Sequence, residues 1–206
     1  MNTPSREAHW DEVYTSKRAD QVSWFEQTPA LSLELIRATG ATPQSAIIDI
    51  GGGASRLIDV LLDKGFAAIT VLDVSATALA AAKVRLGARA TQAIWIVTDV
   101  TCWQPMQRYD VWHDRAAFHF LTEPGDRTAY VVCLKKALAP GGHAIIGTFA
   151  IDGPERCSGL PVMRYDADSL SATLGEGFVL LQSRRHEHRT PAGVIQRFQF
   201  SMFRRT

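Results

Sequence analysis

The stretch that most constrains the fold of this chain is residues 47–62, which read IIDIGGGASRLIDVLL. It opens with a short, mainly apolar run, the pattern of a buried strand, and ends in an amphipathic segment with helical spacing. The glycines between them allow a sharp turn and let a ligand approach the main chain closely. We therefore predict a strand, a glycine turn and a helix capped by Ser55. The free N–H groups and positive dipole end of that helix would face whatever lies over the turn.

The next predicted strand ends in an acidic residue. Residues 68–73 form a second apolar run that finishes at Asp73, twenty residues after Gly53. A carboxylate at this distance from a glycine turn can accept hydrogen bonds from the hydroxyls of a ribose. The dinucleotide-binding fingerprint has a third glycine three residues after the second, where this chain has Arg56. The pattern thus favours an adenosyl compound, and an NAD(P)-dependent reductase is the weaker alternative.

Composition narrows the range of partners. The 206 residues suffice for one domain, and a net charge of +1 gives no electrostatic reason to bind nucleic acid or an anionic membrane. No apolar run approaches the length that spans a bilayer. The three cysteines form no Cys-x-x-Cys pair, so we expect no disulfide framework, no metal site and a cytoplasmic location.

His186 and His188 share one face of a predicted strand, which is more typical of a solvated face than of a metal pair.

Strand and helix patterns alternate along most of the chain, which predicts parallel strands with helices on both faces, the α/β class. Two final strand patterns, joined by a short turn with Pro191 and Gly193, predict an antiparallel hairpin. We expect helices at 8–14, 29–39, 55–64, 76–86, 123–138 and 166–174, and strands at 47–50, 68–73, 92–98, 109–114, 143–149, 178–188 and 194–203. Ser75 is the predicted cap of the helix at 76–86, and residues 151–164 are predicted to form a loop. We expect a single domain, 1–206, in which residues 1–28 form an aromatic-rich lid and residues 29–206 form the catalytic core.

These features resemble the class I, or seven-β-strand, methyltransferases that depend on S-adenosylmethionine (SAM). The pattern Asp49-x-Gly51-x-Gly53-x-Ser55 resembles their motif I, beneath the methionine part of SAM, and Asp73 resembles their motif II acid. The resemblance implies a Rossmann-like three-layer α/β/α sandwich whose seven-stranded sheet has the order 3-2-1-4-5-7-6, with strand 7 antiparallel. It implies SAM as cofactor and S-adenosylhomocysteine (SAH) as product. The implied cofactor-binding residues are Asp49, Gly51, Gly53, Ser55, Asp73, Val74, Asp99, Val100 and His113.

A narrower likeness concerns the methyl acceptor. Trp10 and Tyr14, with the later pair Trp24 and Phe25, are similar to the protein lysine methyltransferases that modify elongation factors. That group has Asp-Lys-Gly at the end of strand 4, whereas residues 114–116 here read Asp-Arg-Ala. We therefore expect an N, O or S nucleophile on a small molecule as acceptor, with a protein lysine as the alternative.

The site of an open α/β sheet lies beyond the carboxyl ends of its strands. A base is needed there only if the acceptor must lose a proton. The candidates for handling the acceptor are His113, Asp114 and His119. The candidates for the acceptor pocket are Tyr14, Trp24, Phe25, Phe118, Phe120 and Cys157. In a purely structural interpretation, Asp114 and Arg115 form an ion pair and His119 caps a helix. A non-catalytic nucleotide-binding module is the alternative outside the enzymes, and the oligomeric state stays open.

Overall fold

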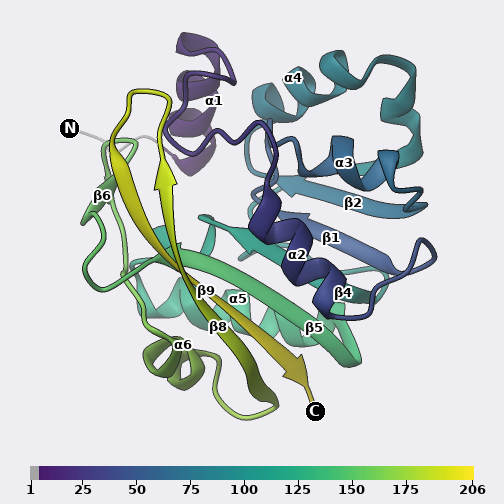
Figure 1. Cartoon of the computed structure of the whole chain (residues 1–206), viewed down its shortest axis with the longest axis vertical. Helices are drawn as coiled ribbons and strands as arrows, with labels where there is room; N and C mark the ends of the chain where they lie inside the picture. The colour runs from purple at the N-terminus through teal and green to yellow at the C-terminus, as the bar shows by residue number, and fades with distance from the viewer. Residues whose placement is uncertain (1–4) are drawn as a thin grey trace.

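A computed structural model describes residues 5–206. Residues 1–4 of the expected lid lie outside the described residues. The main sheet has seven strands in the order β3-β2-β1-β4-β5-β9-β8 (Figure 1). Its strands are β1 (Ala46–Ile50), β2 (Ala68–Asp73), β3 (Ala93–Val97), β4 (Tyr109–Arg115), β5 (Leu138–Phe149), β8 (Phe178–Arg189) and β9 (Ile195–Arg205). The first five are parallel, and β9 runs antiparallel to both β5 and β8. Counted within the sheet, this is the predicted order 3-2-1-4-5-7-6.

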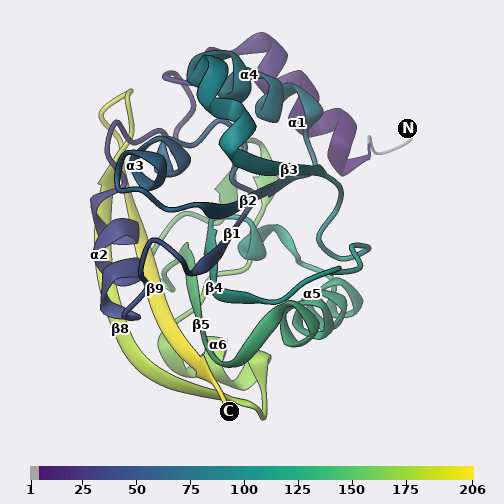
Figure 2. The same ribbon diagram turned by 90° about the vertical axis from the view of Figure 1, so that its right-hand side faces the viewer.

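Helices cover both faces of the sheet, which confirms the predicted three layers (Figure 2). One apolar core includes Leu134 and Leu170, and the other includes Leu35 and Leu79. The first face carries α2 (Ala30–Ala38), α3 (Leu57–Asp63) and α4 (Ala76–Leu86), and the second carries α5 (Pro124–Ala137) and α6 (Ala167–Leu174). Helix α1 (Arg6–Ser16) lies beside α4, outside these two layers. Short 3-10 turns are η1 (Gly87–Gln92) and η2 (Phe118–Phe120).

Several boundaries differ from those predicted. Strand β5 begins at Leu138 rather than at 143, because Leu138 pairs with Tyr109 before the register shifts to Val111 opposite His143. Pro29 is the N-cap of α2 rather than its first residue, and it makes no side-chain cap. The expected loop 151–164 contains a small hairpin, β6 (Arg156–Cys157) and β7 (Leu160–Pro161).

The predicted caps around the glycine turn have clear partners. Ser75 accepts a hydrogen bond from the main-chain N–H of Ala78 and caps α4. Ser55 accepts from the N–H of Leu57 at 3.1 Å, but α3 starts only at Leu57, so its N-cap is Arg56 and not Ser55 as predicted. Both hydroxyls therefore satisfy N–H groups at the helix ends that face the carboxyl edge of the sheet. Among residues 5–206, no helix is both long and apolar enough to cross a membrane.

Candidate functional site

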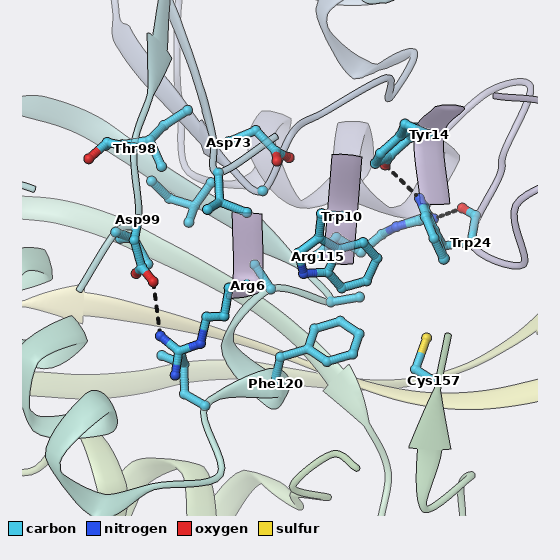
Figure 3. A pocket seen from close by; sticks show the side chains of 18 residues that line it. Arg6, Trp10, Tyr14, Trp24, Asp73, Thr98, Asp99, Arg115, Phe120 and Cys157 are labelled. Carbon is cyan, nitrogen blue, oxygen red and sulfur yellow. Dashed lines mark hydrogen bonds and ion pairs between the residues drawn. The ribbon is translucent and has the colours of Figure 1, made fainter. Parts of the chain in front are cut away.

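A cavity lies at the carboxyl ends of β1, β2 and β4, under α1 and the segment that follows it (Figure 3). It encloses about 780 Å³ of space, part of it open to solvent. Its eighteen lining residues are Arg6, Trp10, Tyr14, Trp24, Ile50, Gly51, Leu72, Asp73, Val74, Thr98, Asp99, Val100, Arg115, Ala116, Ala117, Phe120, Leu121 and Cys157.

Asp73 is the buried carboxylate of this cavity. Its Oδ1 accepts a hydrogen bond from the N–H of Ser75 at 2.8 Å, which fixes the side chain at the end of β2. Burial, together with the nearby negative charge of Asp49, raises the pKa of Asp73 to about 7. A carboxylate that is destabilised in this way gains most from new hydrogen-bond donors such as ribose hydroxyls.

Two glycines allow the turn to pass close to these carboxylates. Gly53 has φ +42°, and a Cβ placed on it would lie 2.9 Å from both Asp73 Oδ2 and Tyr14 Oη. A Cβ on Gly52 would lie 2.6 Å from Asp49 Oδ2. Larger residues at either position would therefore displace the side chains that form the site. The sequence prediction named Gly51 and Gly53, but it did not include Gly52.

Helix α1 is tied to the core by two of its acidic or basic side chains. Arg6 forms an ion pair with Asp99 at 2.9 Å and a second one with Asp126. Asp11 accepts from the hydroxyl of Ser75 at 2.6 Å and from the N–H of Thr77 at 3.1 Å. The bond from Ser75 lowers the pKa of Asp11, and the negative charge lies at the N-terminus of α4, where it is favourable.

We expect α1 to act as a lid and not as part of the core, since none of its residues is fully buried. Removal of residues 1–17 should leave a cooperatively folding chain whose affinity for SAH is about tenfold lower, a loss of ~1.4 kcal/mol. The reason is that Arg6, Trp10 and Tyr14 no longer cover the cavity. Thermal unfolding and titration calorimetry provide the two measurements. Arg18→Ala, at an exposed ion pair on the same segment, is the control. A shortened chain that cannot fold would show that α1 is structural.

Aromatic rings form the wall opposite Asp99 (Figure 3). Trp10 makes edge-to-face contacts with Trp24 and Phe120, with ring centres 5.6 and 4.9 Å apart. The indole N–H of Trp24 donates to the hydroxyl of Tyr14 at 3.2 Å. Burial is the main cause that raises the pKa of this hydroxyl, so Tyr14 stays neutral in the physiological range. Cys157 lies at the same end of the cavity, and burial raises the pKa of its thiol to about 11.

The position of Trp24 depends on an ionic cluster behind it. Arg115 donates to the carbonyl oxygen of Trp24 and forms an ion pair with Glu26 at 2.6 Å. His186 and His188 approach the same carboxylate within 3.8 and 3.4 Å. Burial opposes the ionised form of Glu26, but these two histidines and Arg115 hold its pKa well below the usual range. The two histidines thus bind a carboxylate of their own chain.

A second, smaller pocket adjoins the cavity. The two share Trp24, Gly51 and Arg115. Its polar lining includes the carboxylate of Asp49 and the guanidinium of Arg56, which stands 5.7 Å from the ring centre of Phe25. Ser55 and His113 also line it. A carboxylate and a guanidinium in one pocket are complementary to the ammonium and carboxylate of an amino acid.

The proposed acid–base residues lie away from the cavity. Asp114 is fully buried and accepts from the hydroxyl of Tyr130 at 2.7 Å and from the N–H groups of Ala117 and Phe118. His119 is buried too, accepts from the N–H of Phe149, and has a pKa lowered to about 3 by burial. Neither lines the cavity, so the geometry gives them structural roles and does not favour them as groups that handle the acceptor.

The remaining predicted residues divide between the two pockets. Phe118 is a correction, because it is fully buried against Tyr130 and Tyr165 rather than at the acceptor wall. The ion pair between Asp114 and Arg115 that the alternative, structural interpretation gave is absent among the described residues, because Arg115 pairs with Glu26. The main cavity includes Tyr14, Trp24, Gly51, Asp73, Val74, Asp99, Val100, Phe120 and Cys157, and the second pocket includes Phe25, Asp49, Ser55 and His113. Residues that were not selected from the sequence include Arg6, Trp10, Thr98 and Leu121.

Comparison with known proteins agrees with this geometry. Residues 48–144 match a family model described as a methyltransferase domain. No curated protein matches the chain significantly. Among solved structures, one from work on the conversion of a disulfide bond into a thioacetal group during echinomycin biosynthesis has a TM-score of 0.77 at 22% identity, covering 98% of this chain and 92% of the other.

Two further structures contain SAH. The 1,6-didemethyltoxoflavin-N1-methyltransferase of Burkholderia thailandensis has a TM-score of 0.69 at 20% identity, covering 97% of this chain and 84% of its own. The N-methyltransferase NodS of Bradyrhizobium japonicum has a TM-score of 0.70 at 18% identity, covering 95% and 97%. At these identities the likeness shows the fold. Residues 48–144 thus carry a methyltransferase domain match, and the chain as a whole has the fold of these SAM-dependent methyltransferases.

Proposed function

We propose that the chain transfers a methyl group from SAM to a small, largely apolar acceptor, and that it does so without a general base. The observation that carries this proposal is the lining of the cavity. The carboxylate of Asp99 stands on one side of the cavity, whereas the rings of Trp10, Trp24 and Phe120 and the thiol of Cys157 lie on the other (Figure 3). Positioning is the main catalytic contribution that such a lining can make.

The two pockets fit the two ends of SAM. Asp73 would accept hydrogen bonds from the ribose hydroxyls, and Val74 and Val100 would contact the adenine beside Asp99. Asp49 and Arg56 would take the ammonium and carboxylate of the methionine part in the second pocket. The shared wall at Gly51 then lies between the two ends, where the sulfonium must be.

When bound, SAM supplies a sulfonium-activated methyl group that an in-line nucleophile can accept. The chain holds the acceptor against the rings of Trp10, Trp24 and Phe120 and excludes water from that end. Tyr14 and Cys157 could act as bases there only in their anionic forms. Burial raises the pKa of both groups, so both are neutral near pH 7. The charge of Arg115 is balanced by Glu26. This end therefore suits nucleophiles that need not lose a proton first, such as a neutral ring nitrogen or a thioether sulfur.

The comparisons point in the same direction for acceptor size. The solved structures with this fold include enzymes described as acting on 1,6-didemethyltoxoflavin and on a disulfide of echinomycin. Asp114 is not available to attract the ammonium of a lysine acceptor, because this carboxylate is buried and accepts a hydrogen bond from the hydroxyl of Tyr130. We also propose a cytoplasmic location, which the three unpaired cysteines support.

The acceptor class is tested with radiolabelled SAM and cell lysate that is separated by size after reaction. We expect label in the low-mass fraction, and we expect Trp24→Ala to reduce it about tenfold or more because one wall of the acceptor end is removed. Val132→Ala, an exposed apolar residue on α5, is the matched control. Label in one sharp protein band would contradict the small-molecule proposal. Binding of NAD with no binding of SAM would favour the reductase, and binding of SAM without SAH formation would favour the non-catalytic module.

A further inference from the structure

Three buried side chains from three elements form a hydrogen-bonded chain beside the second pocket. His113 on β4 places Nδ1 2.7 Å from Asp49 Oδ1 on β1 and Nε2 2.9 Å from the hydroxyl of Ser32 on α2. The exposed fractions of Ser32, His113 and Asp49 are 1%, 3% and 4%. Asp49 and His113 are direct partners in the parallel pairing of β1 with β4, so the sheet register itself brings them together.

The chemistry of the partners fixes one bond direction. An ionised carboxylate can only accept, so Nδ1 of His113 carries the hydrogen and donates it to Asp49. The other ring nitrogen bonds the hydroxyl of Ser32, which prevents the ring from rotating. The arrangement holds one carboxylate oxygen, Oδ1, and leaves the other oxygen of Asp49 for a different partner.

The second oxygen, Oδ2, lies beside Gly52, and a Cβ on Gly52 would stand only 2.6 Å from it. A side chain at position 52 would therefore crowd this oxygen. Asp49, His113 and Ser32 all line the second pocket, whose cationic group for a carboxylate is Arg56. The structure thus presents one oriented carboxylate oxygen at the place proposed for the amino-acid end of SAM.

We infer that Ser32 and His113 are positioning residues, which fix Asp49 so that its Oδ2 accepts a hydrogen bond from the ammonium group of SAM or SAH. The inference rests on the proposed function. It adds Ser32 and His113 to the residues that bind SAM, and neither touches the reacting atoms of the ligand. A hydrogen bond between a fixed carboxylate and an ammonium is charge-assisted, so its geometry affects affinity strongly. The sequence analysis had placed His113 at the site but gave Ser32 no role.

The test compares SAH with 5′-methylthioadenosine, which has the same adenosine and thioether but no amino-acid end. We expect His113→Leu to weaken SAH about tenfold or more and to change 5′-methylthioadenosine less than about twofold, measured by titration calorimetry. His113→Asn retains a donor near the position of Nδ1 and should restore most of the SAH affinity. Ser32→Ala should weaken SAH about threefold, with 5′-methylthioadenosine again unchanged.

The matched control is His119→Leu, the same substitution at a buried histidine that lines neither pocket. It should change the affinities for both ligands less than about twofold. Equal losses for the two ligands in His113→Leu, or an unchanged SAH affinity in Ser32→Ala, would overturn the inference. If His113→Leu does not fold, the affinities of Ser32→Ala and His113→Asn for the two ligands decide the question. Wild-type protein that binds both ligands equally would refute the role of Asp49 while leaving the proposed function intact, and failure to bind either would refute both.

Discussion

Asp73→Ala is expected to lower the affinity for SAH at least about a hundredfold, since two charge-assisted hydrogen bonds to the ribose, each worth roughly 1.5–3 kcal/mol, are lost. The carboxylate is buried at the end of β2 and is held there by the N–H of Ser75. Titration calorimetry on folded protein measures the effect. Asp63→Ala, at an exposed ion pair with Arg89, is the control. Unchanged affinity would show that Asp73 does not hold the ribose.

The same residue gives SAH binding a pH dependence. In the empty cavity the pKa of Asp73 is about 7, because burial and the charge of Asp49 favour the protonated form. Ribose hydroxyls donate to the ionised form, so bound ligand lowers this pKa. SAH affinity should therefore be constant above pH 7 and fall by up to about tenfold per pH unit below it. In Asp73→Asn, which has no charge to titrate, this dependence should disappear, and its persistence would assign the titration to another group.

Asp114→Ala is expected to destabilise the chain by about 3 kcal/mol or more and to leave SAH binding by the folded fraction intact. The substitution removes the acceptor for the hydroxyl of Tyr130 and for the N–H groups of Ala117 and Phe118, so these buried or partly buried donors lose their partner. For a chain of this length the loss corresponds to a fall of roughly 6–12 °C in Tm. Calorimetric unfolding measures it. A fully stable variant that binds SAH and forms no product would instead make Asp114 a catalytic residue.

The pH dependence of stability provides a second test of the role of Asp114, because proton binding is linked to folding. Burial is the main cause that raises the pKa of Asp114 from 3.8 to about 6 in the folded state. The folded chain therefore binds the proton more tightly than the unfolded chain, and the contribution of Asp114 to the free energy of unfolding falls as the pH rises from about 4 through about 6. Asp114→Asn should show a flatter stability profile over this window. Asp166→Asn, at an exposed helix cap with a lowered pKa, serves for comparison.

The sequence was sufficient for the features that depend on neighbouring residues. The strand, glycine turn and helix at 47–62, the cap at Ser75 and the antiparallel hairpin each follow from a short local pattern, and their order along the chain defines the sheet. Asp73 was placed by its distance from the glycine turn, and it does line the cavity. Its role in binding the ribose stays a prediction.

The sequence could not show toward which face of the sheet each side chain of β4 points. Successive residues of a strand point to opposite faces. His113 accordingly meets Ser32 of α2 on one side, and Asp114 meets Tyr130 of α5 on the other. Sequence alone does not tell which of these faces adjoins a cavity.

Contacts over long sequence separations were also out of reach. The ion pair of Arg6 with Asp99 joins residues 93 positions apart, and no local pattern marks either as a partner. The directions of Phe118 and Phe120 could not be predicted either, although these residues are only two positions apart. The short η2 turn places Phe118 in the core and Phe120 at the cavity.

The attachment of α1 has a kinetic consequence. Arg6 holds the helix to Asp99, and Asp11 holds it to Ser75, the residue whose N–H fixes Asp73. With α1 acting as a lid, we expect a ligand of the size of SAM to pass only when these contacts break, so that product leaves as this helix lifts. The residence time of the product should then depend on the ion pairs of Arg6 with Asp99 and Asp126. It should shorten as ionic strength rises, because salt screens these partly exposed pairs.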